Sequence, residues 1–106
     1  MFKVEACNEG ETRALAVEGE VDMHSSPQLM EAIRGALSEG KTVAVDLSAV
    51  TYIDSAGIAV LIQGLKAAKR SGLGYRLRSP SARVMSVIAL SQLEDFFEYE
   101  GRGESS

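Results

Sequence analysis

The segment Thr42–Leu47 limits the possible folds of this chain more than any other. Its sequence, Thr-Val-Ala-Val-Asp-Leu, is rich in β-branched residues and almost continuously apolar. This pattern is typical of a central strand that is covered on both faces. Because an amphipathic segment stands on each side of it in the chain, we expect an α/β domain whose sheet packs against helices.

The segment before this strand has the features of a helix with both ends marked. Leu29, Ile33 and Leu37 recur at helical spacing. The run His-Ser-Ser-Pro at 24–27 offers a serine side chain as N-cap and places proline at the first helical position, where its missing N–H costs nothing. Gly40 follows at the position of a left-handed C-terminal cap.

The segment after the strand is expected to be a second helix. A short loop over Ser48–Ile53 leads into it, and apolar residues then recur at helical spacing: Ile58, Leu61, Ile62, Leu65 and Ala68. Asp54 and Ser55 stand at its first turn, where backbone N–H groups lack partners. The simplest role of either side chain is therefore to cap the helix.

The remaining elements complete a mixed sheet. Two alternating segments, Phe2–Cys7 and Ala14–Glu18, are separated by a polar turn and predict an antiparallel hairpin. Tyr75–Arg78 predicts a short strand, the run Ser-Pro-Ser at 79–81 caps a third helix, and Phe96–Tyr99 predicts a last strand. Strands joined by helices lie parallel. The expected fold class is α/β, with an N-terminal antiparallel hairpin and then parallel strands, packed with amphipathic helices. One domain over residues 1–100 and a flexible tail over 101–106 are expected.

The composition excludes several classes of function. The chain has 106 residues, a formal charge of −4 and a pI of about 5.0, so it lacks the cationic field that holds a nucleic-acid backbone. Cys7 is the only cysteine, which excludes an intrachain disulfide, and it is expected to be a small buried residue.

No apolar stretch approaches the length of a membrane span, and the first residues do not resemble a signal peptide. The expected location is therefore the cytoplasm.

The stretch from Gly35 to Thr42 matches the phosphate-binding loop pattern Gly-x-x-x-x-Gly-Lys-Thr. That loop works where a strand ends and a helix begins, because free N–H groups then face the phosphates. Here the order is inverted, since Gly35 lies in the predicted first helix and Thr42 opens the predicted strand. The segment would present a helix C-terminus, whose carbonyls repel phosphate, so nucleotide hydrolysis is disfavoured.

Ser55, in the sequence Asp-Ser-Ala-Gly at 54–57, partly resembles the nucleophile elbow of hydrolases. Ile53 stands where that motif requires glycine, and His24, the one histidine, precedes the serine in the chain. An enzyme that uses Ser55 as its nucleophile is an alternative that labelling by a fluorophosphonate would test. No catalytic residue and no cofactor is expected. No metal site is expected either, because the carboxylates of residues 18–22 have no second histidine to support them.

A basic stretch lies in the second half of the chain. Residues 66–83 contain no acidic residue but several cations: Lys66, Lys69, Arg70, Arg76, Arg78 and Arg83. Cations near a helix C-terminus stabilise its macrodipole, and this accounts for part of the run. The alternative is a local basic patch that faces an acidic partner.

The sequence from Asp46 to Leu61 resembles the signature stretch of bacterial STAS-domain anti-sigma factor antagonists: Asp-Leu-Ser-Ala-Val-Thr-Tyr-Ile-Asp-Ser-Ala-Gly-Ile-Ala-Val-Leu. The run Gly-Glu-Val-Asp at 19–22 resembles a second hallmark of that family. The resemblance implies that Ser55 is phosphorylated by an anti-sigma factor that is also a serine kinase. It implies further that the unmodified domain binds this partner and frees a sigma factor, whereas the phosphorylated domain does not bind and awaits a phosphatase.

The resemblance also implies a docking surface around the serine, made of Asp22, Ser25, Asp54, Ser55, Ala56 and Gly57. Gly57 is expected to let the partner's backbone approach the serine, and a phosphate beside Asp22 and Asp54 is expected to repel the partner. The domain itself is expected to catalyse nothing and to bind no nucleic acid directly. STAS domains also serve as non-catalytic subunits of bacterial lipid ABC transporters and of stress-signalling complexes. The sequence leaves this alternative, and a homodimer, open.

Overall fold

The sheet of the computed structural model, which describes residues 1–101, has the strand order β1-β2-β3-β4-β5. The elements follow along the chain as β1 (Phe2–Glu9), β2 (Thr12–Val21), α1 (Ser26–Ser38), β3 (Thr42–Ile53), α2 (Ser55–Arg70), β4 (Tyr75–Arg78), α3 (Ala82–Leu90), the 3-10 helix η1 (Glu94–Phe96) and β5 (Tyr99–Glu100). Strands β1 and β2 pair antiparallel, and all other neighbours pair parallel. The predicted α/β fold, a hairpin followed by parallel strands, is confirmed.

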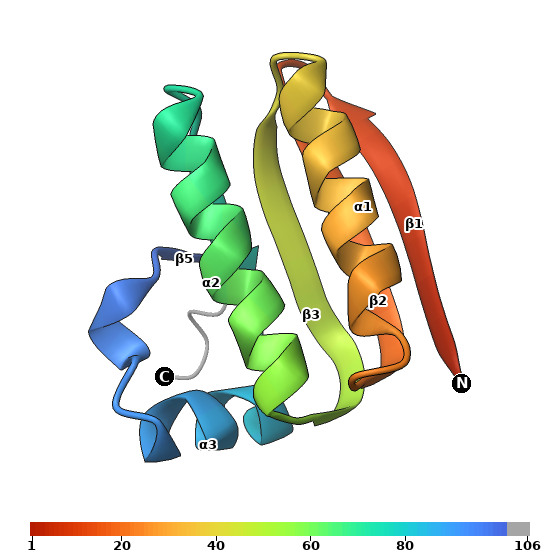
Figure 1. Cartoon of the computed structure of the whole chain (residues 1–106), viewed down its shortest axis with the longest axis vertical. Helices are drawn as coiled ribbons and strands as arrows, with labels where there is room; N and C mark the ends of the chain where they lie inside the picture. The colour runs from red at the N-terminus through yellow and green to blue at the C-terminus, as the bar shows by residue number, and fades with distance from the viewer. Residues whose placement is uncertain (102–106) are drawn as a thin grey trace.

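Helices α1 and α2 lie side by side over β2 and β3 (Figure 1). The main core fills the space between these helices and the sheet. Every second residue of the first half of β3 and of most of β2 points into it, including Leu15, Val17, Val43, Val45 and Leu47. The predicted apolar stripes of the helices meet them, and Leu29, Ile33 and Leu61 are completely buried. Burial of apolar area contributes about 25 cal/mol per Å², so this layer supplies most of the stabilisation.

The segment Thr42–Leu47 of β3 is covered on both faces, as predicted, but by different groups, and Ser48, Thr51 and Tyr52 beyond it are exposed. On the face away from α1 and α2, Ala44 is completely buried and lies in register beside Arg76 of β4. Arg76 and Arg78 alternate with the buried Tyr75 and Leu77, so the arginines occupy this outer face. Long arginine stems can cover apolar surface while their charged ends stay solvated. They take the place of a second helical layer here.

The outer face also carries an ion-pair network that links distant strands. Arg76 pairs with Glu100, and Arg78 pairs with both Glu100 and Glu9. Because β2 and β3 lie between β1 and β4, the Arg78–Glu9 pair spans both inner strands. A hydrogen bond from Arg78 holds the pKa of Glu9 below its ordinary value, and one from Arg76 does the same for Glu100.

This network predicts an acid-sensitive part of the stability. A carboxylate whose pKa is depressed in the folded state stabilises the fold above its unfolded pKa and loses that contribution as pH falls through the folded pKa. Glu100→Gln is therefore expected to lower the thermal midpoint at neutral pH and to have little effect at a pH well below the depressed folded pKa of Glu100. Thermal unfolding followed by circular dichroism measures this. The control is Glu98→Gln, because the Glu98 side chain makes no ion pair within residues 1–101. An equal loss for Glu100→Gln at both pH values would contradict the assignment.

The prediction of a loop over Ser48–Ile53 is wrong, because β3 continues to Ile53. On one side, residues 18–21 of β2 pair with residues 49–53 across two shifts of register. On the other side, beyond the end of β4, the Ser81 N–H donates to the Leu47 carbonyl at 3.2 Å, and the Ser81 hydroxyl donates to that of Val50 at 2.8 Å. Tertiary hydrogen bonds keep this polar segment extended.

Cys7 is exposed, so the prediction that it is buried is wrong. The reason is the period of a strand. Phe2 and Val4 face the core and are half-buried, which places Cys7 on the opposite face of β1. Strand β1 is also the edge of the sheet. A small apolar side chain on the outer face of an edge strand has no layer above it.

The C-terminal part differs from its prediction by a few residues. The last strand is Tyr99–Glu100 instead of Phe96–Tyr99, and the 3-10 helix η1 precedes it. Phe97 leaves the predicted strand because its ring is buried in the core. Gly101, the first residue of the predicted tail, accepts a hydrogen bond from the Ser79 hydroxyl at 2.8 Å. The rest of that tail, residues 102–106, lies outside the described residues.

Candidate functional site

The parallel strands β2 and β3 end together at one edge of the sheet, and an aspartate follows each of them. Val21 and Ile53 are the last paired residues, and Asp22 and Asp54 come next. The Asp54 N–H donates to the Val21 carbonyl at 3.2 Å, which ties the two strand ends together. The carboxyl ends of parallel strands are where ligands bind in open α/β sheets, so this edge is the first candidate for a functional site.

Asp54 caps helix α2. Its Oδ1 accepts hydrogen bonds from the Ala56 N–H at 2.9 Å and the Gly57 N–H at 3.2 Å. The sequence left the cap to either Asp54 or Ser55, and the structure assigns it to Asp54. Ser55 is exposed, and its hydroxyl makes no hydrogen bond within residues 1–101. The first turn of α2 therefore presents a serine hydroxyl to the solvent.

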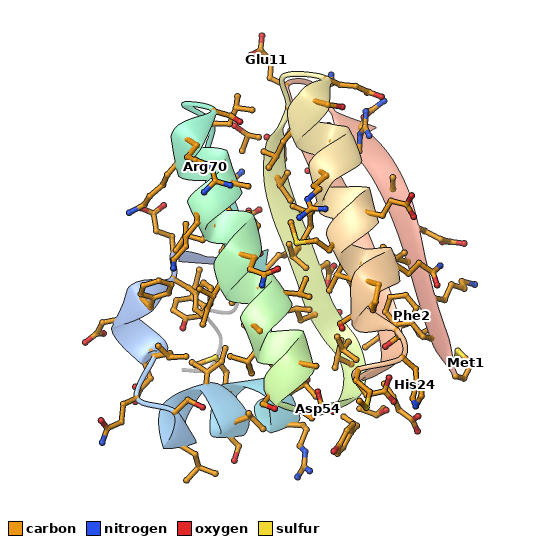
Figure 2. The ribbon with its side chains drawn as sticks, in the orientation of Figure 1. Met1, Phe2, Glu11, His24, Asp54 and Arg70 are labelled. Atoms are coloured by element: carbon orange, nitrogen blue, oxygen red, sulfur yellow. The ribbon has the colours of Figure 1, made fainter. Side chains whose placement is uncertain are left out.

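Asp22 closes the loop between β2 and α1. Its Oδ1 accepts from the His24 N–H at 3.0 Å and the Ser25 N–H at 3.1 Å. These backbone donors, that of Ser25 first, hold the pKa of Asp22 below its ordinary value. The loop therefore carries a negative charge at neutral pH, and Figure 2 shows its His24 at the same end of the molecule as Asp54.

Ser25 is buried, and its hydroxyl serves the same loop. It donates to the Glu20 carbonyl at 2.8 Å and accepts from the Asp22 N–H at 3.0 Å. The prediction that a serine side chain caps α1 is wrong, because Ser25 stands at the N-cap but its hydroxyl is engaged elsewhere. Helix α1 begins at Ser26, so Pro27 is its second residue and not its first.

Gly57 is buried, and the close contact it permits is internal. A Cβ on Gly57 would lie 2.8 Å from the Val21 carbonyl oxygen and 2.6 Å from Ile53 Cγ1. The structure thus gives this glycine a packing role, and the sequence interpretation that it admits the backbone of a partner stays a prediction. Without a side chain at Gly57, the first turn of α2 rests directly on the ends of β2 and β3. This contact fixes where Ser55 is presented.

Two large apolar side chains that sequence analysis did not single out are exposed beside these loops. Met23 follows Asp22 and is 67% exposed, and Tyr52 precedes Asp54 by two residues and is 41% exposed. The Arg83 guanidinium of α3 lies 5.6 Å from the centre of the Tyr52 ring, a cation–π distance. Exposed aromatic, methionine and arginine side chains are typical of protein interfaces. No periodicity in the sequence distinguishes them from core residues.

The other sites weighed from the sequence have a different geometry. Gly35 lies inside α1, Gly40 ends it with φ +75°, and Thr42 opens β3, so the apparent phosphate loop is the C-terminus of a helix. Within residues 1–101, no side chain accepts a hydrogen bond from Ser55, and no three His, Cys, Asp or Glu residues gather as metal ligands. None of the described helices is long and apolar enough to cross a membrane.

Comparison with known protein families shows to which family the chain belongs. The family model described as "Mlab, STAS domain" matches residues 6–98. The chain belongs to the STAS domain family. The membership inferred from the Asp-Ser-Ala-Gly signature is thereby confirmed.

Two curated relatives of this STAS domain have the same name. The anti-sigma-B factor antagonist of Bacillus subtilis is 27% identical over 88 residues, which cover 83% of this chain and 81% of the relative. The anti-sigma-B factor antagonist of Listeria monocytogenes is 29% identical over 83 residues, which cover 77% of this chain and 73% of the relative.

Solved structures share the fold. A candidate anti-sigma factor antagonist of Thermotoga maritima superimposes with a TM-score of 0.82 and 23% identity, covering 92% of this chain and 85% of that one. The Bacillus cell-fate determinant SpoIIAA in its phosphorylated form gives a TM-score of 0.71 at 21% identity, covering 99% and 96%. At these identities the likeness establishes the fold alone.

Proposed function

We propose that this STAS domain is a cytoplasmic anti-sigma factor antagonist whose binding to its partner is switched off by phosphorylation of Ser55. The observation that carries the proposal is the exposed, unbonded Ser55 hydroxyl on a helix that Asp54 already caps. The name shared by the Bacillus and Listeria relatives supports the class of partner. The Asp-Ser-Ala-Gly signature supports the position of the phosphate.

The docking surface is formed by the two aspartate loops. Asp22, Asp54 and Ser55 supply its polar part, and Ala56 and the exposed Met23 and Tyr52 supply apolar contacts. Ser25 and Gly57, which belong to the site inferred from the sequence, act from beneath by fixing the two loops.

The partner kinase catalyses the phosphorylation that operates the switch. The Ser55 Oγ attacks the γ-phosphorus of ATP held by the kinase, the bond to the β-phosphate oxygen breaks, and ADP leaves. The hydroxyl proton passes to a base of the kinase, since Ser55 has no hydrogen-bonded base within residues 1–101. The STAS domain supplies an accessible nucleophile and catalyses nothing, and a phosphatase reverses the modification.

Electrostatics explains why one phosphate is enough. The modification adds about −1.5 to −2 charges beside Asp54 and the ionised Asp22. The Ala56 and Gly57 N–H groups, which would otherwise receive the phosphate, already bind Asp54. Like charges brought together in an interface cost several kcal/mol. The phosphorylated domain is therefore expected to keep its fold and lose affinity.

The proposal is tested by phosphorylation in vitro. Incubation with ATP and the host's anti-sigma factor kinase is expected to add a single phosphate to the chain and none to Ser55→Ala, as measured by intact-protein mass spectrometry. The matched control is Ser71→Ala, at the exposed opposite end of α2, which should be modified like the original. A phosphate on another residue would overturn the proposal, as would stable association with a lipid-transporter ATPase in place of the kinase.

A further inference from the structure

A groove between α1 and α2 adjoins the Ser55 site at Ala56 and extends beyond it along both helices. It consists of two adjoining hollows of about 130 and 400 Å³ that share Met30 and Arg34 of α1. One end begins at Ala56 of the docking surface, and its walls combine apolar residues with Ser26, Arg34 and Gln63. The other end carries Lys66 and Arg70 of α2, and Figure 2 shows Arg70 on the exposed side of that helix. No acidic residue of the described chain lines either hollow. We call this feature the cationic groove.

The cations of the groove have no partner inside the described structure. Arg34, Lys66 and Arg70 make no ion pair or hydrogen bond within residues 1–101. Arg70 lies in the last turn of α2, where it stabilises the helix macrodipole, but Arg34 and Lys66 lie outside the last turns of their helices. By contrast, Arg13 and Arg78, away from the groove, are paired with carboxylates.

Three cations that make no ion pair within residues 1–101 gather in this groove although the chain is acidic. The formal charge is −4, so carboxylates outnumber cations, yet these three cations surround one hollow, which is also lined by Met30 and Ala67. Met30 is only 6% exposed and forms part of the apolar lining. A ligand that matches this arrangement needs carboxylates along its flanks and an apolar side chain between them.

We propose that the cationic groove binds an acidic amphipathic segment of a partner protein. An apolar side chain of the segment packs over Met30, and its carboxylates pair with Arg34, Lys66 and Arg70. Segments of this kind commonly lie in grooves between helices. A bilayer or a nucleic acid fits less well, because the overall negative charge of the chain repels a large anionic surface.

A peptide titration followed by NMR tests this proposal. The probe is a short synthetic peptide of alternating Glu-Glu and Leu-Leu pairs, and its control replaces every glutamate with lysine. Amide shifts are expected along α1 and α2 with the glutamate peptide and not with the lysine peptide. Lys66→Glu is expected to weaken binding about tenfold, since reversing one charge changes an attraction into a repulsion, and added salt should weaken binding too.

The matched variant is Lys69→Glu, on the same helix but outside the lining of the groove, and it should change the affinity much less. Equal effects of the two variants, equal shifts with both peptides, or no shifts would overturn the proposal. Binding to phosphatidylglycerol vesicles that is tighter than to the glutamate peptide would overturn it in favour of a membrane surface. Because the test uses neither kinase nor phosphate, its failure leaves the Ser55 switch standing, and failure of the switch leaves the groove standing.

Discussion

Ser55→Asp is expected to weaken binding to the anti-sigma factor by at least about 100-fold, which corresponds to about 2.7 kcal/mol. The substitution puts a carboxylate on the exposed first turn of α2, next to Asp54 and close to the loop that holds the ionised Asp22. Like charges crowded into an interface cost several kcal/mol, whereas removal of the hydroxyl alone costs much less. Ser55→Ala should therefore bind within about threefold of the original chain. Titration calorimetry against the purified partner measures all three affinities.

Two controls separate this effect from a loss of fold. Ser71→Asp adds the same charge at the far end of α2 and is expected to leave the affinity nearly unchanged. The circular dichroism spectrum of Ser55→Asp should match that of the original, because the Ser55 side chain is exposed and its hydroxyl makes no hydrogen bond within residues 1–101. Unchanged affinity in the aspartate variant would remove the electrostatic basis of the switch.

Gly57→Ala is expected to destabilise the domain by about 1–3 kcal/mol. In the interior of a helix, alanine is normally more stabilising than glycine by about 1 kcal/mol. A decrease in the free energy of unfolding for Gly57→Ala would therefore have the opposite sign to the effect of helix propensity. The cause is the Val21 carbonyl oxygen, which would lie 2.8 Å from the new Cβ and belongs to backbone that also accepts the Asp54 N–H. Urea unfolding gives the change in the free energy of unfolding.

Gly35→Ala is the matched control for this prediction. Gly35 also lies inside a helix, but a Cβ there meets nothing within 4 Å. This variant is expected to gain about 0.5–1 kcal/mol, since only the helix propensity changes. If both substitutions stabilised the domain equally, the close packing of α2 on the strand ends would be disproved, and with it the reason for the position of Ser55.

The arrangement of strands and helices was predictable because it depends on periodic patterns. The apolar spacing of Leu29, Ile33 and Leu37 defines the buried face of α1, and this pattern does not depend on which element covers that face. The extension of β3 to Ile53 was not predictable, because its hydrogen bonds come from residues distant in the chain, such as Ser81. The exposure of Cys7 depends on which face of β1 is covered, and this is a property of the sheet as a whole.

The residues of the candidate site stay a prediction from the signature, and their geometry could not be predicted from the sequence. The signature located Ser55, but either Asp54 or Ser55 could have capped α2, and only the path of the backbone decides between them. The spatial arrangement of the basic stretch over residues 66–83 could not be predicted either, because the fold distributes its cations to separate places. Arg78 joins the outer ion-pair network, Lys66 lines the cationic groove, and Arg83 lies against Tyr52. Proximity in the chain did not place these charges on one surface.

The most direct test of the switch compares one preparation before and after modification. The affinity of the unmodified domain and of the domain phosphorylated on Ser55 is measured against the same anti-sigma factor, and the circular dichroism of both samples is recorded. We expect superimposable spectra and an affinity at least about 100-fold lower for the phosphorylated sample. Equal affinities for the two samples, or a phosphorylated sample that has lost its folded spectrum, would contradict a switch that acts through charge on an intact surface.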